Sequence, residues 1–261
     1  MRYGRTAAWV GVASAGLAML PLAAGAQTRG VVELFTSQGC SSCPPADKLL
    51  GELSADPTIV AISLPIDYWD YLGWKDTLAS PKNSALQKAY AKSRGDREVY
   101  TPQAVVNGSL HVLGSDRKAI EQAILEAKLG SGVLSLPLPV TLSISGGELN
   151  VTLPNASGDQ TSGEVWLCGM VKAASVVIGR GENKGQTITY HNVARRWVKL
   201  GQWNGQAHTF TMSLTEFKAA GVDAVAVIVP ATTADTRQAE AIPESIPIPG
   251  RLLGAAETLI R

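Results

Sequence analysis

The chain has 261 residues, with 23 Lys and Arg against 22 Asp and Glu and a formal net charge of +1. The basic residues are spread along the sequence, so nothing in it predicts an electrostatic surface for nucleic acid or anionic lipid. We therefore expect neither as a partner. The length allows a sizeable core in one domain or two.

The first residues have the layout of a secretory signal. Arg2 and Arg5 precede an apolar run from Ala7 to Ala24, and the small residues Ala24-Gly25-Ala26 follow. The sequence predicts that residues 1–26 are a cleaved signal peptide and that the protein is periplasmic or secreted, free of the membrane after cleavage. A retained anchor is the alternative, because the apolar run is long enough to be considered for one.

Strands and helices alternate in the first half. Pro44-Pro45 suits the first turn of a helix, Ser80-Pro81 is a typical N-cap followed by Pro, and Asn107-Gly108 is a strong hairpin signal. The expected elements, in chain order, are a strand at 31–36, a helix from 44, a strand at 58–64, a helix from 81, strands at 103–106 and 109–113, and a helix starting after 115 or 116.

After about residue 128 the helical spacing gives way to short alternating runs between Gly, Asn and Ser clusters. Their number and spacing predict an all-β, sandwich-like domain at residues 133–230. The expected strands are 140–145, 148–153, 164–171, 187–191, 197–200, 207–212 and 224–229, with a small helix at 213–220. Residues 231–261 are interpreted as a Pro-rich, extended tail.

The cysteines supply the most specific chemistry. Cys40 and Cys43 are two residues apart, and a bridge that short closes too small a loop to stabilise the fold much, which favours reversible chemistry. Cys40 would lie at a helix N-terminus, where unpaired N–H groups and the helix dipole favour a thiolate. Cys43 would then be the resolving thiol, and no cofactor is required because the dithiol carries two electrons. An inert disulfide and half of a metal site are the alternatives.

Three segments together resemble an exported bacterial thioredoxin-like family of unknown function. They are the run from Glu33 to Asp47 (ELFTSQGCSSCPPAD), the run from Asp67 to Asp76 (DYWDYLGWKD), and Thr101-Pro102-Gln103. The stretch from Gly181 to Val193 is also similar to that family. The resemblance implies a thioredoxin-like domain at residues 30–130, with the cysteine pair at its first strand-to-helix turn.

The resemblance also assigns roles to two neighbours of the pair. A cis peptide bond at Thr101-Pro102, facing the cysteines, is the expected companion of such a site. Glu33 lies seven residues before Cys40 on an apolar strand and would relay the proton of Cys43, as a buried acid does in thioredoxins. The spacing is one residue longer than in thioredoxins, and a glutamate that is solvated or bound to N–H groups is the alternative interpretation.

The segment from residue 67 to 76 is unusually aromatic for a loop, and it follows the end of the second strand, where open α/β sheets bind ligands. One interpretation is a partner-binding lip over the disulfide. The other is a small core that joins the first domain to the second. The residues assigned to partner binding are Asp67, Tyr68, Trp69, Asp70 and Trp74.

Together these features predict a thioredoxin-like domain followed by an all-β domain, acting as an exported thiol–disulfide oxidoreductase. Its partners would be thiols or disulfides of exported proteins. One alternative is a binding protein with a static disulfide beside the aromatic lip. Another is a copper or zinc carrier that uses Cys40, Cys43 and His111. Cys168, in an apolar strand, is interpreted as a buried small hydrophobe without a function.

Overall fold

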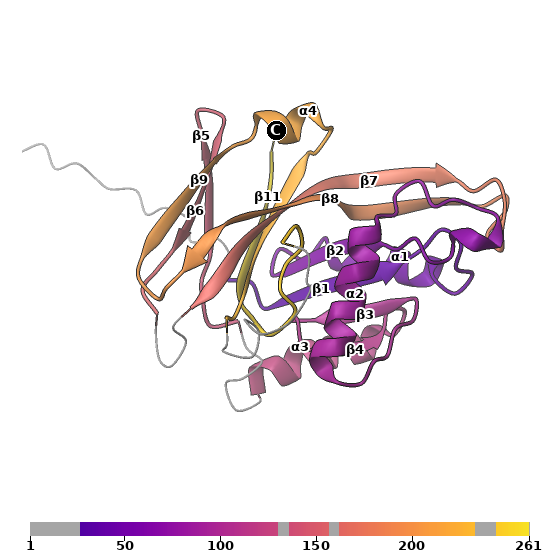
Figure 1. Ribbon diagram of the computed structural model, residues 1–261, viewed down its shortest axis with the longest axis horizontal. Coiled ribbons are helices and arrows are strands. Elements are labelled where there is room, and N and C mark those ends of the chain that lie inside the picture. Colours follow the sequence, from indigo (N-terminus) through magenta and orange to yellow (C-terminus); the bar gives the residue numbers. More distant parts are fainter. Residues whose placement is uncertain (1–26, 130–135, 157–161, 233–243, 261) are drawn as a thin grey trace, which may run out of the picture.

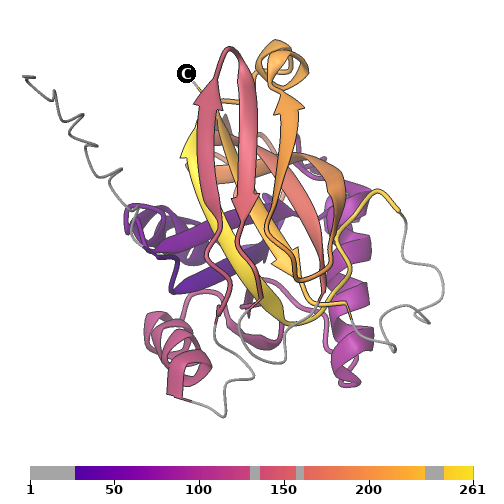
Figure 2. The ribbon, with the colours of Figure 1, turned by 90° about the vertical axis from the view of Figure 1, so that its left-hand side faces the viewer.

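A computed structural model describes residues 27–129, 136–156, 162–232 and 244–260, so the predicted signal peptide, 1–26, lies outside the described residues. The protein has a mixed α/β fold with a large sheet and few helices (Figures 1 and 2). No helix among the described residues is both long and apolar enough to cross a bilayer.

The first half contains each strand and helix that the sequence predicts there. Ser80 caps its helix by accepting a hydrogen bond from the Lys82 amide, and both residues of the Asn107-Gly108 turn have positive φ angles, 51° and 73°. The elements are β1 (Gly30–Thr36), α1 (Pro44–Leu53), β2 (Ile59–Pro65), the 3-10 turn η1 (Asp70–Leu72), α2 (Pro81–Arg94), β3 (Gln103–Val106), β4 (Leu110–Leu113) and α3 (Arg117–Leu129).

The second half differs from the prediction in two places. The strands expected at 187–191 and 197–200 are parts of one long strand, and the C-terminal tail ends in a strand that the sequence did not suggest, because its Gly and Ala residues have low strand propensity. The elements are β5 (Thr141–Ser145), β6 (Glu148–Leu153), β7 (Gly163–Val177), β8 (Thr187–Trp203), β9 (His208–Ser213), α4 (Thr215–Ala219), β10 (Ala224–Pro230) and β11 (Leu252–Leu259).

Strands from both halves belong to one eight-stranded sheet, in the order β11-β10-β7-β8-β2-β1-β3-β4. The halves meet where β8 pairs in parallel with β2, through Ser63 and Val193. β5, β6 and β9 form a separate three-stranded sheet. The change of sequence pattern near residue 130 therefore marks the end of the helix-rich half, and the large sheet contains strands from both sides of this point.

One face of the large sheet has a single hydrophobic core to which both halves of the chain contribute, and the other face has a separate core for each half. On the shared face, Tyr90 of α2 packs in one cluster with Phe35 of β1 and Cys168 of β7. On the other face, α1 and α3 cover the first half, and the three-stranded sheet with α4 covers the second. Figure 2 shows the three-stranded sheet in front of β7, β10 and β11.

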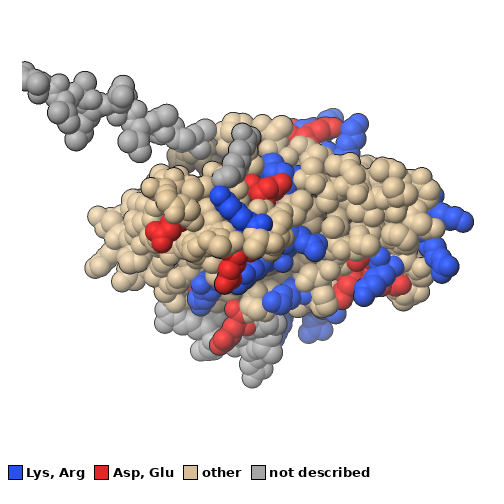
Figure 3. All heavy atoms as spheres, turned by 90° about the horizontal axis from the view of Figure 1, so that it is seen from above, with Lys and Arg blue, Asp and Glu red and all other residues tan. Residues whose placement is uncertain are grey.

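Charged side chains are interspersed on the surface. The face in Figure 3 has basic and acidic groups side by side, with wide areas carrying neither. Several of them form exposed or half-exposed ion pairs, such as Arg196 with Glu216 at 2.9 Å. Exposed pairs of this kind contribute little to stability, so the cores between the layers are the main source of it.

A buried acid lies in the shared core. Glu33 of β1 is fully buried, its Oε2 accepts a hydrogen bond from the Tyr90 hydroxyl at 2.6 Å, and its Oε1 has no partner among the described residues. Burial raises the pKa of Glu33 from 4.5 to about 7, and the Tyr90 hydrogen bond offsets only part of this. Glu33 therefore binds a proton in the folded chain at pH values where an unfolded chain has released it.

This difference predicts how stability depends on pH. Because the folded pKa is the higher one, the contribution of Glu33 is fully present below pH 4.5 and is lost as the pH rises toward 7. Glu33→Gln removes this loss. Between pH 4.5 and pH 8, the free energy of unfolding of the variant should therefore rise by roughly 3 kcal/mol relative to that of the wild type. Urea unfolding across this range measures the gain. A pH-independent difference between the two proteins would contradict the prediction, and the exposed Glu148→Gln is the matched control.

Candidate functional site

Cys40 and Cys43 form the disulfide that the sequence predicts, with Cα atoms 5.4 Å apart, and Cys168 is free and buried in β7. Cys43 is the N-cap of α1, and Pro44 and Pro45 occupy the first turn. Proline has no N–H to leave unpaired there, so the sequence at this turn fits a helix start. Burial raises the pKa of the Cys168 thiol well above its usual value, which keeps it protonated and unreactive.

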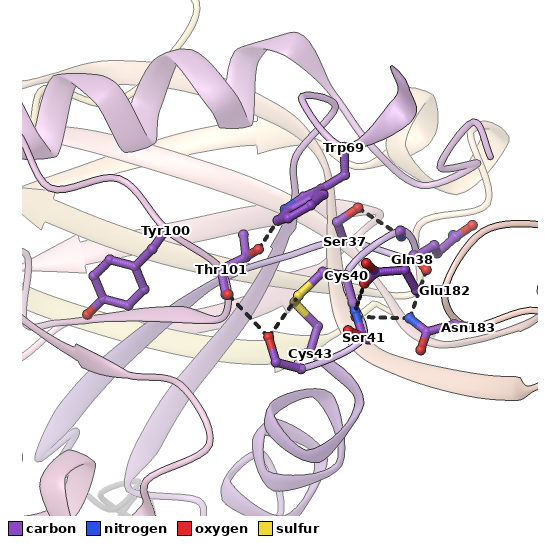
Figure 4. The surroundings of a disulfide bond; sticks show 12 residues. Ser37, Gln38, Cys40, Ser41, Cys43, Trp69, Tyr100, Thr101, Glu182 and Asn183 are labelled. Atoms are coloured by element: carbon purple, nitrogen blue, oxygen red, sulfur yellow. Dashed lines mark hydrogen bonds between the residues drawn. A yellow bond between two sulfur atoms is a disulfide. The ribbon is translucent and has the colours of Figure 1, made fainter. Parts of the chain in front are cut away.

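Both cysteines of the disulfide are buried. Cys40 is 2% exposed and Cys43 is fully buried, whereas Ser41 and Ser42 are exposed. The Ser42 hydroxyl lies 3.4 Å from the sulfur of Cys40 and 3.5 Å from the carbonyl oxygen of Thr101. The Thr101-Pro102 peptide bond is cis, as predicted, and Thr101 lies beside the disulfide (Figure 4).

Trp69 contributes to this cover. Its Nε1 donates a hydrogen bond to the Thr101 hydroxyl at 2.7 Å, and its Cβ approaches Gly39 so closely that a Cβ on Gly39 would lie only 3.0 Å away. The ring thus reaches from the cysteine loop to Thr101 (Figure 4). Tyr71, 78% exposed, stacks against the Trp69 ring with centroids 6.3 Å apart. A partner would meet Tyr71 first and Trp69 next.

The other residues assigned to partner binding are engaged within the protein. Tyr68 donates to Gln87, Asp67 accepts from Ser84, Asp70 accepts from the Asp76 amide, and Trp74 donates to Gln38. Trp74 also lies against Gly179 and Gly181, beyond the end of β7. Trp74 thus joins the two halves of the chain, as the second interpretation of the aromatic segment expects, and Trp69 lies near the disulfide (Figure 4). A role in partner binding stays a prediction.

Side chains from distant positions fix the cysteine loop. Asp76 accepts a hydrogen bond from the Gln38 amide at 2.8 Å. Asn183, between β7 and β8, donates to the carbonyl oxygens of Gln38 and Cys40 at 3.0 and 2.9 Å. Its neighbour Glu182 accepts from the Ser41 amide at 3.0 Å (Figure 4). These contacts of Glu182 and Asn183 were not predicted, because more than 140 positions separate the partners, although the stretch from Gly181 to Val193 resembles the same family as the cysteine loop.

Glu33 lies on the face of the sheet opposite to α1. Side chains alternate along β1, so Glu33 and Phe35 face α2, while Val32 and Leu34 pack against α1. Its hydrogen bond, among the described residues, is to Tyr90 and not to the cysteine pair. Glu33 therefore lies on the other face of the sheet from α1, whose N-cap is Cys43, and its role as a proton relay for Cys43 stays a prediction.

Asp47 is the buried acid on the face of the pair. Its amide donates to the Cys43 carbonyl oxygen, so the two residues are one helical turn apart on the same side of α1, and the Asp47 side chain leans toward the helix start. Asp47 is 2% exposed, and neither carboxylate oxygen has a hydrogen-bond partner among the described residues. A signal was present in the sequence, since position i+4 from Cys43 carries a carboxylate in the first turn of the expected helix.

The pKa of Asp47 reflects these surroundings. Burial raises it well above its usual value, the nearby Thr36 hydroxyl lowers it in part, and the charge of Asp76 raises it further. Burial likewise raises the pKa of Asp76, against three hydrogen bonds from the amides of Gln38, Leu78 and Ala79. The disulfide therefore has a protonated carboxyl group behind it on α1 over a wider pH range than an ordinary aspartate would allow.

The described residues provide no metal site. No group of three or more His, Cys, Asp or Glu within them is arranged to hold an ion. His111 of β4 faces the Tyr100 hydroxyl at 3.0 Å and Asp96 at 3.2 Å. The predicted alternative of a copper or zinc carrier thus lacks its ligand set in this part of the chain.

Comparison with other proteins identifies the family. Residues 31–230 match a family described as "Protein of unknown function (DUF1223)", and the chain belongs to it. The structure is similar to the crystal structure of Protein AGR_C_4864 from Agrobacterium tumefaciens, with 30% sequence identity and a TM-score of 0.76. The similarity covers 89% of this chain and 95% of that one. The chain matches no curated protein.

The position of Trp69 generates a prediction about access to the disulfide. Trp69→Ala removes the ring between the cysteine loop and Thr101, so dithiothreitol should reduce the Cys40–Cys43 bond several-fold faster. Trp69→Phe keeps a ring but has no donor for Thr101, so its disulfide should be reduced faster than that of the wild type and more slowly than that of Trp69→Ala. Tyr71→Ala is the matched control, because it removes only the exposed outer ring. Equal rates for Trp69→Ala and Tyr71→Ala would contradict the assigned cover.

Proposed function

We propose that this member of the family is an exported thiol–disulfide oxidoreductase whose first half is a thioredoxin-like unit. The observation that carries the proposal is a disulfide at the start of α1 with a buried acid, Asp47, one helical turn further along, whose pKa is raised by burial and whose oxygens have no hydrogen-bond partner among the described residues. Perturbed acids next to a reactive group are typical of catalytic sites. Export is supported by the layout of residues 1–26.

The arrangement of the first half supports the thioredoxin-like assignment. The order β1-α1-β2-α2-β3-β4-α3 is that of the thioredoxin core, with β1 and β2 parallel and β3 and β4 antiparallel. The cysteine pair lies at the first strand-to-helix turn, and the cis bond at Thr101-Pro102 immediately precedes β3.

In the proposed reaction, a partner thiolate attacks the sulfur of Cys40. The Cys40–Cys43 bond breaks, a partner–Cys40 disulfide forms, and Cys43 leaves with the electron pair. Asp47 donates its proton to the leaving Cys43 thiolate, so the buried negative charge moves from the sulfur to the Asp47 carboxylate, which then regains a proton from water. A second partner thiolate then attacks the partner sulfur and releases Cys40, so the partner is oxidised by two electrons and the pair is reduced. With a disulfide partner, the same steps run in reverse.

The burial of both cysteines favours a second candidate function, a binding protein with a static disulfide beside Trp69 and Tyr71. The two candidates differ in one property. An oxidoreductase must let a partner reach Cys40, whereas a static disulfide stays closed to partners of any size. Trapping of covalent intermediates distinguishes the two.

Trapping should be asymmetric. In Cys43→Ser, Cys40 can attack a partner disulfide but nothing resolves the product, so mixed disulfides with exported proteins should accumulate on non-reducing gels. Cys40→Ser should trap almost none, because Cys43 is fully buried. Equal trapping by both variants would contradict the assigned roles. If neither variant traps a partner, the static disulfide is the better description.

Asp47→Asn tests the proton transfer. Asn cannot donate or accept the proton of Cys43, so exchange with a model disulfide should slow roughly tenfold or more and lose its dependence on the titration of Asp47. Because the folded pKa of Asp47 is raised, the wild type loses stability relative to the variant as the pH rises. Slower exchange in a variant of equal or greater stability would separate catalysis from folding.

The matched control for Asp47→Asn is Glu33→Gln. It neutralises the other buried acid on β1, which faces away from α1, and it should leave the exchange rate unchanged. A loss of exchange in Glu33→Gln together with normal exchange in Asp47→Asn would assign the relay to Glu33 instead.

A further inference from the structure

A carboxylate from the second half of the chain lies at the beginning of α1. Glu182, between β7 and β8, accepts a hydrogen bond from the Ser41 amide through Oε2 at 3.0 Å. This N–H belongs to the peptide group that joins Cys40 to Ser41. The contact is therefore made to the peptide group attached to the Cα atom of Cys40, the proposed nucleophile toward a partner disulfide (Figure 4).

The surrounding contacts hold Glu182 in place. Its neighbour Asn183 is 1% exposed and binds the carbonyl oxygens of Gln38 and Cys40 on the same loop. Gln186 in turn donates to the Asn183 side chain at 3.2 Å. Trp74 packs against Gly179 and Gly181 on the other side. The turn is thus fixed to the cysteine loop by the side chain of Asn183.

The Ser41 amide is an N–H donor on the peptide group that directly follows Cys40, three residues before the first residue of α1, Pro44. N–H groups at the start of a helix favour a thiolate there and lower its pKa. Glu182 takes up this donor and adds a negative charge of its own, while the Ser42 hydroxyl, 3.4 Å from the sulfur, stays available.

We propose that Glu182 destabilises the Cys40 thiolate and so makes the dithiol a stronger reductant. This rests on the proposed function, because it concerns the reactivity of the same pair. A reduced form that is less stable has a more negative reduction potential. Glu182 acts through the Ser41 amide and its own charge, and is a positioning residue rather than a catalytic one.

Other charged groups on the elements around the pair do not duplicate this contact. Among the described residues, Glu182 is the charged side chain with a hydrogen bond to the Cys40–Ser41 peptide group. The remaining charged residues on these elements are Asp47, Lys48 and Glu52 on α1, Asp67, Asp70, Lys75 and Asp76 in the aromatic segment, and Arg180 and Lys184 in the turn.

The test uses chains in which Cys40 is the reactive thiol. Reduced Cys43→Ser and Cys43→Ser/Glu182→Gln proteins are alkylated with iodoacetamide across a range of pH, at 0.05 M and 1 M salt. Gln keeps an acceptor for the Ser41 amide and removes only the charge. The Cys40 titration should move to lower pH, with about two- to fivefold faster alkylation below the pKa. The difference should shrink at 1 M salt, where the Debye length is about 3 Å.

Glu148→Gln is the matched control for Glu182→Gln. Glu148→Gln makes the same charge change at an exposed position on β6 and should leave the Cys40 titration in place. An unchanged titration in the Glu182→Gln chain, or an equal shift from Glu148→Gln, overturns the proposal. With both cysteines present, Glu182→Gln should also give a more positive reduction potential.

Failure of the proposed function is distinguishable from failure of this inference. Alkylation reports the acidity of Cys40 whether or not a protein partner exists. Absence of trapped partners would remove the oxidoreductase assignment and leave the Glu182 result standing. If partners are trapped but Glu182→Gln does not change the Cys40 titration, the oxidoreductase assignment stands and the proposal for Glu182 is wrong.

Discussion

The junction at Asn192 is the constraint on which the site depends. β8 pairs with β2 at one position, Ser63 with Val193, and Asn192 lies beside it with a φ angle of 49°. Asn tolerates this left-handed conformation better than most residues. Its buried side chain donates to the Ala61 carbonyl oxygen at 2.8 Å, which satisfies a backbone acceptor where the strands part. From there the β7–β8 hairpin extends past α1 (Figure 1), and its turn reaches the cysteine loop.

One consequence is that the cysteine loop has few backbone groups left without partners. The aromatic segment supplies Asp76 for the Gln38 amide, and the hairpin turn supplies Asn183 and Glu182 for the groups around Cys40. Satisfying these groups allows the disulfide to lie beneath the surface at little cost in unpaired donors or acceptors. The same contacts let residues far along the chain act on the sulfur chemistry.

The sequence predicted those features that local chemistry determines. The cysteine pair, the helix beginning at Pro44 and the hairpin at Asn107-Gly108 each depend on residues adjacent in the chain, whereas the cis bond at Thr101-Pro102 was expected from the resemblance to a family. The large sheet shared by both halves, β11, and the contacts of Glu182 depend on pairings between distant segments, for which one sequence has no local signal. Glu33 shows the intermediate case, in which the strand was predicted but the hydrogen bond to Tyr90 depends on a helix residue 57 positions away.

The two buried acids also differ in how the fold accommodates them. Glu33 has the Tyr90 hydroxyl at 2.6 Å, so part of its burial is compensated within the core. The Asp47 carboxylate oxygens have no hydrogen-bond partner among the described residues, and the nearby Thr36 hydroxyl offsets only part of the burial that raises the pKa of Asp47. Asp47 also lies in the first turn of α1, where the helix dipole favours a carboxylate. An acid whose burial is compensated only in part is expected where function constrains the position. Because Asp47 follows Cys43 by one turn and Glu33 faces away from α1, the proposed oxidoreductase would carry its proton transfer on the α1 side of the sheet.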